Sequence, residues 1–267
     1  MEHIEYSDKR EAPIAVFDSG VGGISVLRAL VKEMPNENYW YFGDSANAPY
    51  GTKTLEEVRS LTFSHVEHFM EYGAKAVVVA CNTATAAAVR LLRQKYPDYT
   101  FVGIEPALKP AVYEKPNPNV IVMATPMTIR EDKFHNLMDK YIDLAHIIPL
   151  PCPGLMEYIE KGITDGEELD NFLRKLFAPF APERIDSVVL GCTHYPFVSE
   201  EISKVLGNNI KLFEGGPGTA RETKRRLAEK DLLTSRTTAG TVRFENSAMT
   251  DDKLKLCEKL LYGHTKG

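Results

Sequence analysis

The chain has 267 residues, 43% of them hydrophobic and 26% charged, with a formal net charge of −5 at pH 7. This length is sufficient for one large hydrophobic core or two smaller ones. The mildly acidic balance argues against a nucleic-acid or anionic-membrane partner, so we expect neither. The densest basic stretch, 221–230, is interleaved with glutamates and is typical of a solvated helix face.

The N-terminal stretch "MEHIEYSDKREAP" lacks the apolar core of a signal peptide, and no apolar run approaches the length of about 20 residues that spans a membrane. We therefore expect a soluble, cytoplasmic protein. In a reducing cytosol its cysteines are expected to be reduced thiols; they are Cys81, Cys152, Cys192 and Cys257.

Short apolar runs alternate with helical patterns along the chain. The runs are rich in Val, Ile and Phe, and several are apolar throughout, as is typical of strands buried on both faces of a parallel sheet. They predict strands at 14–18, 39–43, 76–80, 100–104, 119–124, 146–150, 187–191 and 210–213.

The segments between these runs carry helix signals. Thr54 with Glu57, and Thr128 with Glu131, match the capping box and predict helices over 54–72 and 128–140. Further helices are expected over 85–96, 196–206 and 251–263. In the last of these Cys257 falls on the apolar stripe, which indicates a core thiol.

Alternation of strands and helices predicts an α/β fold with mainly parallel sheets. Internal similarity favours two such units, because "VVVACNT" pairs with "VVLGCTH" at an offset of 111 and "IAVFDS" pairs with "VIVMAT" at about 106. We therefore expect two similar parallel-sheet α/β domains related by pseudo-two-fold duplication, with the active site in the cleft between them. The expected domains are 1–103 plus 212–267, and 104–211.

Ligands of open α/β sheets bind at the carboxyl ends of the strands. Both Cys81 and Cys192 follow a predicted strand and precede a predicted helix, whose N–H groups and dipole favour a thiolate. One such cysteine is readily explained as a buried structural thiol, but a matched pair favours function. The other polar residues at predicted strand ends are Asp18, Ser19, Asp44, Ser45, Asn82, Thr83, Thr125, Thr193 and His194.

The glycine-rich turn "FDSGVGG" (17–23) lies between the first predicted strand and helix, where a carboxylate or phosphate could bind. A dinucleotide site is the alternative, with Asp44 as the ribose-binding acid. Two observations weaken it: the third glycine is missing, and Asp18 would lie close to a pyrophosphate. The cysteines lack C-x-x-C spacing and no His/Cys cluster accompanies them, so we expect no metal and no cofactor.

Two opposed thiols suit one kind of reaction. Inverting a stereocentre by proton transfer requires a base on one face of the carbon and an acid on the other, and the reverse reaction exchanges their roles. His194 beside Cys192 could activate that thiol or move a proton. Groups that could hold the carboxylate and ammonium of an amino acid are Asp18, Ser19, Asn82, Thr83 and Thr193.

Four motifs, "FDSGVGG", "GDSANAPYG", "ACNTATA" and "GCTHYPF", resemble those of the glutamate racemases in order and spacing, from about residue 14 to about residue 215. These enzymes belong to the cofactor-independent aspartate/glutamate racemase superfamily. The resemblance implies an isomerase that interconverts L- and D-glutamate, supplies D-glutamate for peptidoglycan and forms a homodimer. A racemase of aspartate or another amino acid, a nicotinamide oxidoreductase and a non-catalytic amino-acid-binding module are the alternatives.

The resemblance also implies roles for individual residues. Cys81 is then the catalytic acid/base for the D-enantiomer, supported by Asp18, and Cys192 that for the L-enantiomer, supported by His194. The expected substrate-binding residues are Asp18, Ser19, Tyr50, Gly51, Asn82, Thr83, Thr125, Thr193 and His194.

A catalytic glutamate is also implied, in the segment "CPGLMEYIEKG" (152–162). Alignment on Cys152 and Gly162 places it at Glu160, and Glu157 is the alternative.

Overall fold

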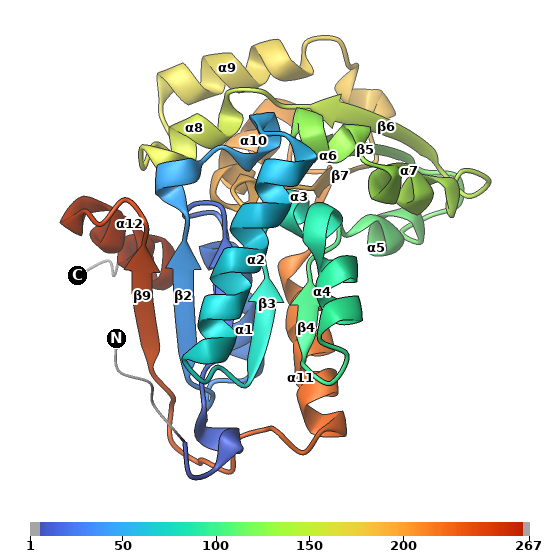
Figure 1. Cartoon of the computed structure of the whole chain (residues 1–267). Coiled ribbons are helices and arrows are strands. Elements are labelled where there is room, and N and C mark those ends of the chain that lie inside the picture. The colour runs from blue at the N-terminus through green and yellow to red at the C-terminus, as the bar shows by residue number, and fades with distance from the viewer. Residues whose placement is uncertain (1–5, 264–267) are drawn as a thin grey trace. The chain divides into compact units, whose positions relative to one another are not determined.

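The apolar runs of the sequence form strands that pair in parallel in two separate sheets (Figure 1). The structure, a computed structural model, describes residues 6–263. Its sheets belong to two units of the chain, one made of the residues up to Ile104 with those from Gly216 onward, the other of Glu105–Gly215. The expected α/β class with two parallel-sheet units is thus confirmed.

The first unit contains the sheet β4-β3-β1-β2-β9. Its strands are β1 (Ile14–Asp18), β2 (Tyr39–Gly43), β3 (Ala76–Val79), β4 (Phe101–Gly103) and β9 (Val242–Asn246). The sequence analysis missed β9, which pairs in parallel with β2 at the sheet edge. Its charged Arg243 and Glu245 alternate with other residues, so it lacks the continuous apolar run of the inner strands.

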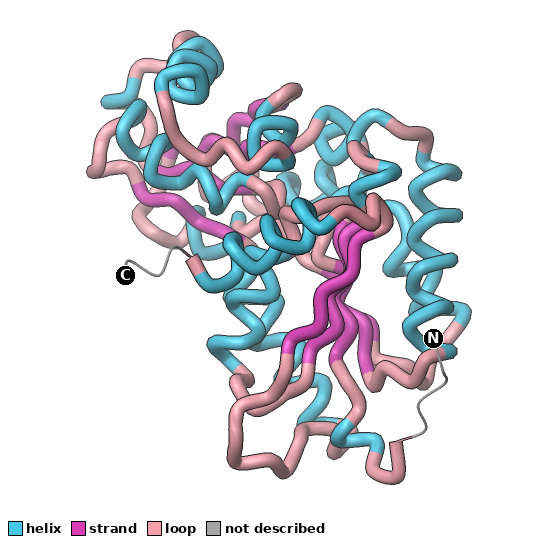
Figure 2. The backbone as a smooth tube through the Cα atoms, turned by 90° about the vertical axis from the view of Figure 1, so that its left-hand side faces the viewer, coloured by secondary structure: helices cyan, strands magenta, loops and turns pink. Residues whose placement is uncertain are grey.

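Helices cover both faces of this sheet (Figures 1 and 2). The connection β1–α1–β2 runs toward β9, whereas β2–α2–β3 crosses back over β1. Because parallel crossovers are right-handed, α1 and α2 lie on opposite faces. The helices of this unit are α1 (Ile24–Glu33), α2 (Leu55–Glu71), α3 (Asn82–Ala84), α4 (Arg90–Lys95), α11 (Gly216–Glu229) and α12 (Asp251–Tyr262).

The second unit contains the sheet β6-β5-β7-β8. Its strands are β5 (Asn119–Ala124), β6 (His146–Pro151), β7 (Ser187–Leu190) and β8 (Lys211–Glu214). Read in chain order, these four strands pair in the same order as β1, β2, β3 and β4 do. The internal repeat of the sequence therefore corresponds to a repeated topology, and it places Cys81 and Cys192 after equivalent strands.

Alternate residues of β5 enter two different cores on the two faces of this sheet. Ile121 and Met123 pack with residues of α8, α9 and α10, whereas Val120 and Val122 pack with residues of α5 and α7. This pattern explains why the strand is apolar throughout. The helices of this unit are α5 (Leu108–Val112), α6 (Pro126–Arg130), α7 (Asp132–Asp139), α8 (Leu155–Glu160), α9 (Glu167–Phe177) and α10 (Ser199–Leu206).

The single helix expected over 128–140 is wrong, because two short helices occupy this segment. Thr125, and not Thr128, caps the first of them, α6: its Oγ1 accepts a hydrogen bond from the Thr128 N–H at 3.2 Å. Glu131 then has extended dihedral angles and separates α6 from α7. The capping box of Thr54 and Glu57, by contrast, is present at the start of α2.

Two expected boundaries also differ. The second unit extends to Gly215, beyond the expected 211, because Lys211–Glu214 pairs with β7. The helical run expected from 85 begins at Asn82 and includes a π-helical turn over Thr85–Val89. Of the helices described, none is both long enough and apolar enough to cross a membrane.

Candidate active site

Parallel strands bring their carboxyl ends to one edge of a sheet, and polar residues gather there in each unit. In the first unit these include Asp18 at the end of β1, Asp44 after β2 and Cys81 after β3. In the second unit Thr125 follows β5 and Cys192 follows β7. Each unit thus carries its own group of candidate site residues, called here the Cys81 half-site and the Cys192 half-site.

Cys81 is the N-cap residue of the helical run that begins at Asn82. Its Sγ accepts a hydrogen bond from the Ala84 N–H at 3.4 Å and lies 3.5 Å from the Ser19 Oγ. The residue is 6% exposed. The amide at the helix N-terminus stabilises a thiolate, and the Ser19 Oγ accepts the hydrogen of the neutral thiol, so the surroundings of Cys81 suit a proton-transferring thiol.

Asp18 is fully buried beside the glycine-rich turn. Its Oδ1 accepts a hydrogen bond from the Gly20 N–H at 2.9 Å, so the carboxylate uses an amide that a dinucleotide pyrophosphate would need. A Cβ at Gly23 would lie 2.5 Å from the Asp18 Cβ. Gly23 therefore permits close packing within the protein, and the turn offers little support for the dinucleotide alternative.

Asn82 presents an unused acceptor in the Cys81 half-site. Within residues 6–263 its Oδ1 is buried without a hydrogen-bond partner. A buried acceptor left unpaired costs about 1–3 kcal/mol, so such an atom often marks the position of a ligand donor. The neighbouring Thr83 is also buried.

Asp44 organises a second group of side chains in the same unit. Its Oδ2 accepts hydrogen bonds from the Tyr50 hydroxyl at 2.6 Å and from His65 Nε2 at 3.1 Å, and its Oδ1 accepts one from Asn47 at 3.0 Å. Burial raises the pKa of Asp44, but its hydrogen bonds outweigh this effect and hold the pKa well below its usual range. Asp44 is therefore a buried carboxylate anion at neutral pH.

Tyr50 belongs to the 3-10 turn Tyr50–Thr52, which contacts α3. The residue is 1% exposed, so the "NAPYG" turn does not carry a surface tyrosine. Burial and then the hydrogen bond to Asp44 raise the pKa of Tyr50, with further contributions from Cys81 and Asp18. The hydroxyl thus remains a proton donor, and Gly51 follows it in the same buried turn.

The Cys192 half-site contains a chain of three groups. The Cys192 Sγ lies 3.7 Å from His194 Nδ1, and His194 Nε2 lies 2.9 Å from Glu160 Oε1. Burial lowers the pKa of His194, but the hydrogen bonds and charges of Cys192 and Glu160 outweigh it, so the pKa is well above its usual value. The His194 ring, held between the Cys192 sulfur and the Glu160 carboxylate, is therefore protonated more readily than an ordinary histidine.

The expectation that Cys192 stands directly before a helix is wrong. The next helix is the 3-10 turn Tyr195–Val198, and its N-cap is His194. The His194 ring, and not a helix N-terminus, is therefore the group that faces the Cys192 sulfur. Thr193 is buried between the two residues.

The structure brings Glu160, and not Glu157, to the Cys192 half-site. Glu160 ends α8 with its carboxylate against His194, whereas Glu157 is exposed. Thr125 lies at the start of α6. Its hydroxyl caps α6 and lies 2.9 Å from the Thr128 hydroxyl.

Two further buried residues, Cys152 and Tyr195, lie in the Cys192 half-site and were not predicted as site residues. Cys152 follows β6, and its Sγ donates a hydrogen bond to the Leu150 carbonyl at 3.3 Å. Burial, together with the charge of Cys192, raises the pKa of Cys152 to about 12, so this thiol stays protonated. The Tyr195 hydroxyl lies 3.5 Å from the Cys152 carbonyl oxygen. The strand-end position of Cys152 was the signal that could have drawn attention to it.

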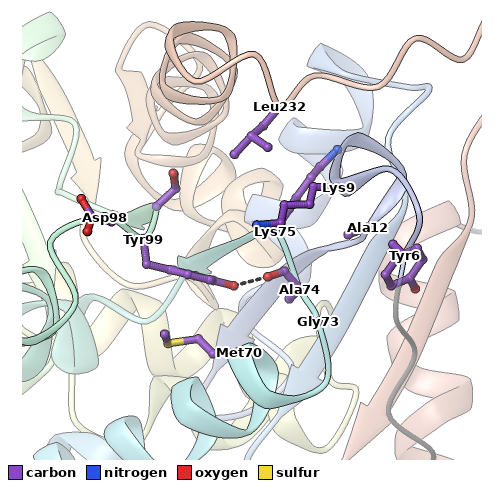
Figure 3. Close-up of a pocket in the computed structure, with 11 residues that line it drawn as sticks. Tyr6, Lys9, Ala12, Met70, Gly73, Ala74, Lys75, Asp98, Tyr99 and Leu232 are labelled. Atoms are coloured by element: carbon purple, nitrogen blue, oxygen red, sulfur yellow. Dashed lines mark hydrogen bonds between the residues drawn. The ribbon is translucent and has the colours of Figure 1, made fainter.

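A cavity of about 380 Å³ lies elsewhere in the first unit, at the amino ends of β3 and β4 (Figure 3). Its lining includes Lys75 and Tyr99. The Lys75 ammonium is paired with the Glu37 carboxylate at 2.5 Å, and the Tyr99 hydroxyl donates to the Ala74 carbonyl. The cavity contains none of the predicted site residues.

One property of the Cys192 half-site can be tested without substrate. We expect Glu160→Gln to lower the pKa of His194, because an amide cannot stabilise the imidazolium by charge. Because the pKa of His194 is raised in the folded state, protonation of His194 contributes to stability in full below about pH 6.5, the pKa of an unfolded histidine. This contribution is lost as pH rises through the folded-state pKa. An NMR titration of the His194 ring measures the shift, with Glu157→Gln as the control. An unchanged His194 titration would show that Glu160 does not govern its charge.

Comparisons with known proteins agree on one family. A model of the family described as Asp/Glu/Hydantoin racemase matches residues 14–223, a range that includes both Cys81 and Cys192. A glutamate racemase of Clostridium novyi (strain NT) is 51% identical over 255 residues, which are 95% of this chain and 98% of that relative.

Solved structures show the same similarity. The glutamate racemase of Francisella tularensis, in complex with D-glutamate, has a TM-score of 0.82 and 28% identity, over 94% of each chain. That of Escherichia coli, in complex with L-glutamate and the activator UDP-MurNAc-ala, has a TM-score of 0.83 and 30% identity, over 93% of this chain and 95% of its own. Among residues 6–263 no group of three or more His, Cys, Asp or Glu side chains could hold a metal ion.

Proposed function

The chain belongs to the Asp/Glu/hydantoin racemase family, and from this we propose that it is a glutamate racemase that uses Cys81 and Cys192 as its two proton-transferring groups. The observation that carries the proposal is the repeated placement of a cysteine after the third strand of each unit. Each cysteine has different support: an amide and a hydroxyl at Cys81, an imidazole at Cys192. Curated relatives with about half of their residues identical bear the name glutamate racemase.

The two thiols exchange roles in the proposed reaction. With L-glutamate, a Cys192 thiolate removes the Cα proton and becomes a thiol, while the electron pair of the broken C–H bond stays on the substrate. The Cys81 thiol then donates its proton to the opposite face of Cα and becomes a thiolate. With D-glutamate the sequence starts from a Cys81 thiolate, so each direction leaves the pair ready for the other.

The electrostatics of each half-site support these roles. His194 as an imidazolium stabilises the thiolate form of Cys192, and Glu160 balances the charge that this buried cation introduces. At Cys81 the Ala84 N–H stabilises the thiolate by a hydrogen bond and not by a neighbouring charge. Asp18, at the end of the neighbouring strand β1, is assigned as the residue that assists proton transfer by Cys81.

Substrate binding is proposed to use the polar groups at the same strand ends. The unpaired Asn82 Oδ1 accepts a hydrogen bond from the substrate ammonium, since an amide oxygen pairs with a donor. The buried turn of Tyr50 and Gly51 offers backbone amides to a carboxylate. The remaining proposed contacts are Asp18, Ser19, Thr83, Thr125, Thr193 and His194.

We further propose that the D-glutamate serves peptidoglycan synthesis and that the enzyme is a cytoplasmic homodimer. The resemblance to glutamate racemases supports these three statements. Growth of a D-glutamate-requiring bacterium on expression of the chain tests the first, and light scattering of the purified protein tests the oligomeric state. A Cys81→Ala variant is the control for the growth assay.

A racemisation assay decides among the candidate functions. Purified protein is mixed with L- or D-glutamate, and separately with L- or D-aspartate, with no cofactor added, and optical rotation is followed. We expect both glutamate enantiomers to reach a racemic mixture and aspartate to react far more slowly. Preference for aspartate would identify the alternative racemase, and binding of amino acids without any turnover would identify a binding module.

A further inference from the structure

His65 is a partly buried histidine that belongs to none of the sequence motifs and has no role in the proposed mechanism. It lies on α2, and its side chain is 21% exposed. Its ring packs against Phe17 of β1 and Phe42 of β2, with centroid distances of 5.2 and 4.7 Å. Two aromatic contacts and one hydrogen bond therefore fix the orientation of the ring.

The hydrogen bond of His65 has a defined direction. Its Nε2 lies 3.1 Å from the Asp44 Oδ2, and Asp44 is held in the carboxylate form by the groups around it. A carboxylate can only accept, so His65 Nε2 must carry the hydrogen and donate it. The same Oδ2 accepts the Tyr50 hydroxyl at 2.6 Å.

Asp44 therefore connects α2 to the turn that carries Tyr50 and Gly51. One oxygen atom receives donors from both sides, so the position of the carboxylate depends on both. The 3-10 turn Tyr50–Thr52 in turn contacts α3, whose first residue is Asn82. After burial and Asp44, the negative charge of a Cys81 thiolate also contributes to raising the pKa of the Tyr50 hydroxyl.

We propose that His65 is a positioning residue which, through Asp44, holds the Tyr50–Gly51 turn in the orientation that binds the substrate. This inference rests on the proposed function, because it assigns the turn to the binding of glutamate. His65 itself touches neither the substrate nor the two thiols. It pre-orders the turn, so its contribution is made equally in the ground state and in the transition state.

The test compares two replacements of His65 in the full chain. His65→Phe keeps a ring against Phe17 and Phe42 but removes the donor, whereas His65→Gln supplies an amide donor. We expect His65→Phe to raise the KM for both glutamate enantiomers about tenfold, equivalent to about 1.4 kcal/mol of binding, with kcat changed less than about threefold. His65→Gln is expected to restore most of the KM.

His68→Phe is the matched control, because His68 lies one turn further along α2 and packs against Trp40 and Tyr72. Its KM and kcat are expected to remain within about twofold of the wild type. A His65→Phe enzyme with an unchanged KM, or a His65→Gln enzyme no better than His65→Phe, would overturn the positioning role.

A substrate-free measurement separates this inference from the proposed function. The unfolding free energies of His65→Phe, Tyr50→Phe and the double variant form a double-mutant cycle in urea. Because both side chains act through the same Asp44 oxygen, the first replacement already loosens the shared anchor, and we expect the double variant to lose less than the sum of the two single losses. Additive losses would contradict the connection through Asp44, whether or not the wild type acts on glutamate. A wild type that does not racemise glutamate would contradict the proposed function alone.

Discussion

Replacement of Cys81 or of Cys192 by alanine is expected to abolish racemisation in both directions. In the proposed mechanism each turnover requires one group to remove the Cα proton and another to deliver a proton to the opposite face. Loss of either sulfur therefore interrupts the reaction of both enantiomers. We expect kcat to fall by at least about 10³-fold, which corresponds to about 4 kcal/mol of additional barrier.

Cys257→Ala provides the matched control for these two variants. Cys257 is fully buried in α12 and belongs to neither half-site. Its replacement is expected to leave activity near that of the wild type. Circular dichroism of all three variants checks that they fold. If either strand-end variant folded and kept more than about a tenth of the wild-type kcat, the two-thiol assignment would be wrong.

Asp44→Asn is expected to have the second largest effect, on both stability and activity. Asp44 accepts hydrogen bonds from Tyr50, His65 and Asn47, and an amide in its place must direct its N–H₂ group toward donors. Loss of a buried, hydrogen-bonded charge of this kind costs about 3 kcal/mol. Because the Tyr50–Gly51 turn would lose its anchor, we also expect kcat/KM to fall about a hundredfold.

The stability effect of Asp44→Asn depends on pH with a defined sign. The folded-state pKa of Asp44 is lowered, so its charge contributes fully above the unfolded value of about 3.9 and is lost as pH falls toward the folded value. Urea unfolding should therefore show a large gap between wild type and variant at pH 7 that narrows below about pH 4. Asp98→Asn, at an exposed carboxylate, is the control. A gap that did not change with acidification would contradict the role of the Asp44 charge.

Much of the fold could be predicted because the inner strands are apolar throughout. All eight expected strands are present, and the repeated run ending in Cys81 and Cys192 indicated the repeated topology. The strand β9 was missed because an edge strand buries less surface and can alternate apolar and charged residues, as Arg243 and Glu245 do. At 125–131 the capping potential of Thr128 competed with that of Thr125, and only the structure shows that Thr125 prevails.

The positions of the candidate site residues were predictable at the strand ends and less so within helices. Asp18, Cys81 and Cys192 stand where parallel strands stop, which is a position that sequence reveals. The partnership of His65 with Asp44 joins a helix face to a strand end 21 residues earlier, and nothing in the local pattern of α2 distinguishes His65 from His68. Contacts between elements of this kind depend on packing, which periodicity does not report.

Proton exchange in heavy water tests the two-thiol mechanism most directly. L-Glutamate is incubated with the enzyme in D₂O, and early samples are analysed by proton NMR at Cα, with D-glutamate treated in parallel. In the proposed mechanism one thiol removes the substrate proton while the opposite thiol delivers a solvent-derived deuteron. The product is therefore expected to carry deuterium while the unreacted substrate keeps its proton, in both directions. Substantial deuterium in recovered substrate at low conversion, or product that retains the original proton, would contradict transfer by two opposed groups.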